Sequence, residues 1–211
     1  EVTLLHRAIP SPNLALYLQN TFSLHMSAPE TDYAINMAKE LLAIAKKRVA
    51  NPSQKLKDTE KVRVICWDPV SPAYDYYKWI EKHFGAIVVI DYEGSNFIPD
   101  IDTSSRESMI RGLGEYRLMT GMVRQTHGDA RFITEELAQY IDEYSADCVI
   151  MSNTSGCKGN MATKKLVIDT CNKHGVPSLF LDTDIYDKRI NSEAETKNKI
   201  RDFFISNGWG R

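Results

Sequence analysis

The chain has 211 residues and a mass of 24.0 kDa, which is enough for one α/β domain with additional helices and a core that needs no disulfide or metal to hold it. Hydrophobic residues make up 43% and charged residues 26% of the sequence, and 26 Lys and Arg against 28 Asp and Glu give a formal net charge of −2. This composition excludes disordered, collagenous and coiled-coil chains, and it offers no excess of positive charge for binding nucleic acid.

No apolar run approaches the roughly 20 residues needed to cross a bilayer, and the beginning of the chain lacks the pattern of a signal peptide. We therefore expect a cytoplasmic protein that makes no membrane contact. The chain begins with Glu1 rather than Met, so we expect it to be processed or to be part of a longer polypeptide. Its four cysteines lie far apart and form no Cys-x-x-Cys pair, which argues against a disulfide framework, a zinc ribbon and a thioredoxin-type centre.

The first predicted element is an amphipathic helix over residues 31–49, where apolar residues recur at steps of three and four. Asn51 and Pro52 end this helix, and the polar stretch 54–60 is predicted to be a linker. We accordingly divide the chain into a helical connector segment at 1–56 and an α/β domain at 57–211.

From residue 62 onward, short apolar runs alternate with helical patterns. The runs 62–67, 86–91, 148–152 and 178–182 are typical of parallel strands buried on both faces. Helices are predicted at 73–84, 107–119, 131–144, 160–174 and 192–206, with Phe132 placed on the buried stripe of the third and Ser192 beginning the last through a capping box. This order predicts a Rossmann-like, doubly wound parallel sheet of four strands.

Ligands bind such sheets beyond the carboxyl ends of the strands, and the loop after the third strand carries the most suggestive chemistry. Cys157 lies there between Gly156 and Lys158, just before a helix predicted to begin at Asn160. The positive helix end and the nearby lysine would both favour a thiolate, which can act as a nucleophile or as a metal ligand. The alternative is a small buried residue in a tight turn. Core positions are expected for the remaining cysteines, which are Cys66, Cys148 and Cys171.

Other familiar signals are absent from the sequence: it contains no dinucleotide fingerprint, phosphate loop or Gly-x-Ser-x-Gly elbow. His127, in a polar loop beside Arg124 and Asp129, is the most suggestive histidine. We expect it to be a solvated loop residue.

Several of these pieces occur in a recognisable order. They are Ser152-Asn153-Thr154-Ser155-Gly156-Cys157-Lys158, a helix, Gly175-Val176-Pro177, a strand ending at Asp184, Asp187-Lys188-Arg189 and an acidic helix ending near Phe204. The arrangement resembles the carboxyl-terminal half of the large subunits of the 2-hydroxyacyl-CoA dehydratase and benzoyl-CoA reductase family.

The resemblance implies a 4Fe–4S cluster held by three cysteines, of which Cys157 would be the third. The other two ligands would lie outside this chain, which we therefore expect to be part of a polypeptide nearly twice as long. Neighbours implied to tune the sulfur or to face the cofactor cavity are Ser155, Gly156, Lys158, Asn153 and Ser152. Three further residues, Asp182, Asp184 and Arg189, are interpreted as loop architecture.

The resemblance also implies an activity and partners. An ATP-dependent iron–sulfur activator would inject one electron, and the enzyme, paired with a second homologous subunit, would eliminate water from a (R)-2-hydroxyacyl-CoA through a ketyl radical to give the 2-enoyl-CoA. Arg124 and His127 would then contact CoA phosphates or a partner. Three alternatives remain open: a benzoyl-CoA reductase subunit, a metal-free partner subunit, and a phosphate-binding α/β module that uses the helix start at Asn160.

Overall fold

The computed structural model describes residues 1–18, 20, 31–68, 76–92, 100–119, 128–154, 156–184, 187, 189 and 192–210. Its centre is an all-parallel sheet of β1 (Val62–Asp68), β2 (Ala86–Asp91), β3 (Cys148–Thr154) and β4 (Ser178–Thr183), in the order β2-β1-β3-β4. The four apolar runs predict these strands, although β3 continues two residues further than expected. The doubly wound α/β fold is confirmed.

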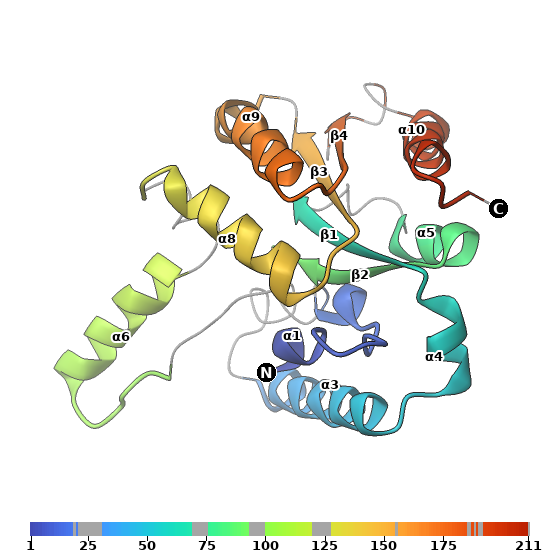
Figure 1. Ribbon diagram of the computed structural model, residues 1–211. Helices are drawn as coiled ribbons and strands as arrows, with labels where there is room; N and C mark the ends of the chain where they lie inside the picture. The colour runs from blue at the N-terminus through green and yellow to red at the C-terminus, as the bar shows by residue number, and fades with distance from the viewer. Residues whose placement is uncertain are drawn as a thin grey trace.

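Helices cover both faces of the sheet (Figure 1). One face packs against α5 (Tyr76–Phe84) and α10 (Glu193–Ser206), and the opposite face packs against α8 (Arg131–Glu143) and α9 (Lys158–Lys173). Side chains alternate along β1 accordingly, because successive residues of a strand point to opposite faces. Val64 and Cys66 contribute to the first core, whereas Ile65 and Trp67 contribute to the second.

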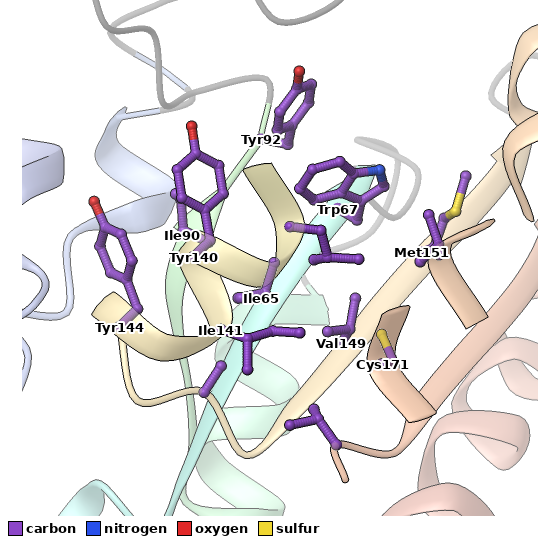
Figure 2. Close-up of a cluster of buried hydrophobic side chains, with 14 of the residues drawn as sticks. Ile65, Trp67, Ile90, Tyr92, Tyr140, Ile141, Tyr144, Val149, Met151 and Cys171 are labelled. Carbon is purple, nitrogen blue, oxygen red and sulfur yellow. The ribbon is translucent and has the colours of Figure 1, made fainter. Parts of the chain in front are cut away.

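Aromatic rings fill the outer part of both cores. Figure 2 shows Trp67 and Tyr92 near the ends of their strands and Tyr140 on the neighbouring helix; the first two rings have centroids 4.5 Å apart. On the opposite face the rings of Phe84 and Phe204 stack with centroids 4.7 Å apart, which joins α5 to α10. These contacts fix the helices against the sheet and so position the loops that follow each strand.

The N-terminal segment packs beside the edge strand β2. It contains α1 (Val2–Leu5) and α3 (Asp32–Ala50), which contact one another around Leu14, Leu41 and Ala45. The hydroxyl of Thr31 caps α3 by accepting a hydrogen bond from the backbone N–H of Ala34. The helix predicted at 31–49 is therefore confirmed.

Two buried polar side chains fasten this segment to the sheet. His6 shares a 2.9 Å hydrogen bond with the carbonyl of Val89, and Arg63 donates to the carbonyls of Tyr144 at 2.7 Å and of His6 at 2.9 Å. Arg63 also pairs with Glu60, and both side chains are buried. These contacts satisfy backbone carbonyls that the sheet edge and the chain reversal would otherwise leave unpaired.

Three details of the sequence prediction are wrong. The expected linker contains a helix, α4 (Gln54–Thr59), which begins because the Ser53 hydroxyl caps the backbone N–H of Leu56. Phe132 lies on the outer side of α8, so it is not part of the buried stripe. The helix expected to start at Asn160 starts two residues earlier, at Lys158.

The remaining predictions concern the helix at 107–119, residues outside the described ranges, the domain boundary and membrane-spanning segments. A helix predicted at 107–119 is confirmed as α6 (Arg106–Met119), none of whose fourteen residues is buried. Arg124, His127 and the expected start of the helix at residue 73 lie outside the described residues. The boundary predicted after residue 56 falls inside α4 and stays a prediction. Of the helices in the described ranges, none is long and apolar enough to cross a membrane.

Candidate functional site

The topology itself selects one end of the sheet as the place for a ligand. From β1 the chain passes through α5 to β2 on one side, while β3 and β4 lie on the other side and are joined through α9 on the opposite face. The direction of winding therefore reverses between β1 and β3. In open parallel sheets the carboxyl ends of the two strands at such a switch point flank the usual binding crevice.

Cys157 lies at this crevice, in the loop that follows β3. It is the N-cap residue of α9, its backbone is extended at φ −77° and ψ 100°, and its carbonyl accepts from the N–H of Met161 at 3.2 Å. Gly156, at φ +84°, makes the left-handed turn that brings the chain from the strand into the helix. The cysteine is half-buried, and in the described part of the chain its sulfur caps no backbone N–H. Its position leaves the sulfur available to a ligand.

The remaining cysteines are unsuited to such a role. Cys66, Cys148 and Cys171 are buried, and burial raises the pKa of all three thiols, that of Cys171 to about 11. They stay protonated core residues, as the sequence predicts. Cys157 is therefore the one cysteine of this chain whose surroundings suit an iron ligand.

These observations test how a 4Fe–4S cluster would fit. Such clusters take their ligands mainly from cysteine thiolates. Among the described residues no group of three His, Cys, Asp or Glu side chains is arranged to hold a metal. The described residues thus offer such a cluster one candidate ligand, Cys157.

Asn153 connects the elements around Cys157. The residue is 4% exposed, and its Nδ2 donates to Asp182 Oδ1 at 2.9 Å and lies 2.9 Å from the sulfur of Met161. Asn153 belongs to β3, its register partner Asp182 belongs to β4, and Met161 lies in the first turns of α9. One amide therefore ties together both strand ends and the helix that Cys157 begins.

Two polar atoms beside this connection lack partners. Within the described ranges, Asn153 Oδ1 and Thr183 Oγ1 are buried and take part in no hydrogen bond. Unpaired buried polar atoms are uncommon in proteins, and each calls for a specific explanation, of which a functional role is one. Both belong to the carboxyl ends of neighbouring strands, next to the loop that carries Cys157.

The other site residues predicted from sequence are placed as follows. Ser152 is buried in β3, Gly156 and Lys158 are exposed, and Ser155 lies outside the described residues. Their roles toward a cofactor stay predictions.

The loop beyond β4 has the architectural contacts expected of it. Asp184 Oδ1 accepts the backbone N–H of Asp187 at 2.8 Å, and Arg189 pairs with the Asp187 carboxylate at 2.6 Å. The hydrogen bond from Arg189 lowers the pKa of Asp187. These contacts agree with the interpretation of Asp184 and Arg189 as loop architecture, as does the bond of Asp182 to Asn153, and the interpretation stays a prediction.

Sequence reasoning missed a buried polar group at the same end of the sheet. The Tyr77 hydroxyl donates to the carboxylate of Asp91, which lies opposite Cys66 in the sheet. Burial, followed by the negative charge of Asp91, raises the pKa of Tyr77 well above its ordinary value. The parallel register that places Cys66 opposite Asp91 brings these residues together. They stiffen the carboxyl ends of β1 and β2 on one side of the crevice.

This geometry defines a class of protein: a doubly wound α/β subunit with one accessible thiol at the switch point of its sheet. The family model of the 2-hydroxyglutaryl-CoA dehydratase D-component matches residues 1–204. The chain therefore belongs to this dehydratase family, in agreement with the resemblance drawn from the Cys157 loop.

A curated relative supports the assignment. The chain is similar to a benzoyl-CoA reductase subunit of Thauera aromatica, with 32% identity over 71 residues, which is 33% of this chain and 16% of the relative. The matched stretch thus spans about one sixth of the length of that protein.

Proposed function

We propose that the chain is part of a subunit of an iron–sulfur 2-hydroxyacyl-CoA dehydratase. The reaction would convert a (R)-2-hydroxyacyl-CoA into the 2-enoyl-CoA through a ketyl radical, after ATP-driven electron transfer from an activator protein. It is redox-neutral overall, because the 2-hydroxyl and a β-proton leave as water and the electron accepted by the thioester carbonyl is returned. The observation that supports the proposal most directly is Cys157, an accessible thiol beginning a helix at the switch point of a dehydratase-family fold.

In this proposal the residues of the chain hold and shield the reacting centre. Cys157 would hold one iron of a 4Fe–4S cluster, which when bound supplies the low-potential electron that the elimination needs. The first backbone N–H groups of α9 and the charge of Lys158 would stabilise the thiolate. Asn153 would keep the loop in place through its bond to Asp182, and the aromatic core around Trp67 and Tyr92 would exclude water from one wall. The remaining thiolates and the second subunit would come from outside this chain.

The test measures iron in the complex that the protein forms with its partner subunits. Wild type, Cys157→Ser and Cys171→Ala are purified under anoxic conditions and assayed for iron, acid-labile sulfide and the electron paramagnetic resonance signal of the reduced cluster. We expect Cys157→Ser to lower iron content at least two-fold and to change the spectrum, because one ligand is lost. Cys171→Ala should match wild type, because Cys171 is a buried core residue. Equal iron in all three proteins would refute the ligand assignment and would instead support a metal-free partner subunit.

A second candidate activity is ATP-dependent reduction of an aromatic ring, which the 71-residue similarity to the Thauera aromatica benzoyl-CoA reductase favours. The two activities are separated by offering the activator-supported complex a 2-hydroxyacyl-CoA and benzoyl-CoA under the same anoxic conditions. Formation of an enoyl-CoA without a net loss of reductant supports the dehydratase. Consumption of reductant with loss of the aromatic absorbance supports the ring reductase.

A further inference from the structure

A broad groove lies beside the edge strand β2, away from the loop that carries Cys157. It is bordered by the end of α3, by α4 and by α5, and its floor includes Ala86 and Val88 of the edge strand β2. Its volume is about 1380 Å³, which exceeds the roughly 300–1,000 Å³ of ordinary small-molecule pockets. The dimensions suit a segment of another polypeptide.

Basic side chains gather around this groove although the chain as a whole carries a net charge of −2. Among its described lining residues five are Lys or Arg and two are Asp or Glu; the basic residues are Lys47, Arg48, Lys55, Lys78 and Lys82. They come from three different helices, so the concentration of charge is a property of the fold and not of the polar face of one helix.

Part of this charge is available to a partner. Within the described part of the chain, Lys47, Lys55 and Lys82 are exposed and pair with no acidic group. Arg48 has a structural role, because its guanidinium donates to the carbonyl of Pro12 at 2.8 Å and so holds one wall of the groove. Positive potential in a concave site attracts and orients an acidic partner.

Apolar side chains lie between these charges. Tyr17 is 51% exposed and Ile44 is 36% exposed, and both line the groove together with Leu16. An apolar strip with a charged rim is the pattern to which an amphipathic helix binds, with its apolar face in the groove and its charged face toward the rim. Nucleic acid is a poorer occupant, because the net charge of the chain repels a long polyanion and the floor of the groove is aliphatic.

We propose that the groove between α3, α4 and α5 is a docking site for an acidic amphipathic helix of a partner protein. The apolar residues of that helix would cover Tyr17 and Ile44, and its carboxylates would pair with Lys47, Lys55 and Lys82. No described residue of the Cys157 loop lines this groove, so the partner would bind without covering Cys157.

The test uses the full chain and fluorescence anisotropy. The probe is a fluorescein-labelled 16-residue helical peptide with Leu at every third or fourth position and Glu on the polar face, and the matched peptide has Lys in place of every Glu. We expect the acidic peptide to bind at least ten-fold more tightly than the basic one and to weaken as NaCl is raised from 0.05 to 0.5 M.

Variants assign the binding to the groove. Lys55→Glu/Lys82→Glu should weaken binding at least ten-fold, and Ile44→Ser several-fold through the apolar contact. The control Lys39→Glu/Lys173→Glu changes the net charge by the same amount at exposed residues that do not line the groove, and it should stay within two-fold of wild type. The proposal is overturned if the control weakens binding as much as the groove variant, if both peptides bind equally, or if a 16-residue oligothymidine displaces the acidic peptide from the groove.

Discussion

Acidification should weaken the attachment of the N-terminal segment to the sheet through one side chain, His6. Its Nδ1 donates to the carbonyl of Val89 at 2.9 Å and its Nε2 accepts the N–H of Leu14 at 3.2 Å, an arrangement that only the neutral ring can make. Burial lowers the pKa of His6 from 6.5 to about 4; the bond to Val89 partly opposes this, and the charge of Arg63 adds to it.

The sign and size of the effect follow from linkage. Below pH 6.5 the unfolded chain binds a proton at His6 that the folded chain does not accept until about pH 4. The contribution of His6 to the free energy of unfolding is therefore fully present above pH 6.5 and is lost as the pH falls from 6.5 to about 4. The difference between the two pKa values corresponds to about 3 kcal/mol.

Urea unfolding followed by circular dichroism at pH 7, 6, 5 and 4.5 measures this loss. His6→Gln can still donate and accept a hydrogen bond but does not ionise, so wild type should lose about 2–3 kcal/mol more than this variant between pH 7 and 4.5. His83→Gln, at an exposed histidine, should follow wild type. Acidic side chains with lowered pKa values, such as Asp129 and Asp187, titrate in every variant and cancel in the comparison. Parallel pH curves for wild type and His6→Gln would refute the reasoning.

Three further substitutions test the packing, each by urea unfolding at pH 7. Arg63→Met should cost about 3–5 kcal/mol because it leaves Glu60 buried without its partner, and adding Glu60→Gln should recover part of that loss; a cost below about 1 kcal/mol would contradict the buried pair. Phe204→Ala removes the ring stacked on Phe84 and should cost about 3–5 kcal/mol, whereas unchanged stability would show that α10 does not anchor this core. Ser192→Ala removes the hydroxyl that caps the N–H of Glu195 and should cost about 1 kcal/mol, whereas Ser192→Asp should be nearly neutral.

The sheet could be predicted from the sequence because β1, β2 and β3 are buried on both faces and the edge strand β4, although only partly buried, begins with a similar apolar run. A strand buried on both faces appears in the sequence as a continuous apolar run, such as 86–91. Such a run can be recognised without knowing its neighbours in the tertiary structure. The short polar helix α4 has no such signature, since none of its residues is buried and its start depends on the hydroxyl of Ser53. The exposure of Phe132 could not be predicted either. Periodicity shows which face of a helix is apolar, but it does not show how much of that face the neighbouring elements cover.

The candidate site was only partly predictable for a related reason. Residue type and the flanking glycine single out Cys157, because both are local features. The bond from Asn153 to Asp182 joins residues 29 positions apart and depends on the register of β3 and β4. The contact of Tyr77 with Asp91 likewise depends on how α5 lies over the sheet. Distances of this kind are set by the tertiary structure, and no pattern along the chain encodes them.

Cysteine at the start of α9 has a consequence for protein engineering. Serine, aspartate and asparagine are the residues that best begin a helix, and each would stabilise the chain by about 1 kcal/mol over a residue whose side chain caps nothing. A screen that rewards heat resistance alone should therefore replace residue 157, and would discard the thiol while improving the fold. Thermostable versions of this protein should be selected with that position held fixed.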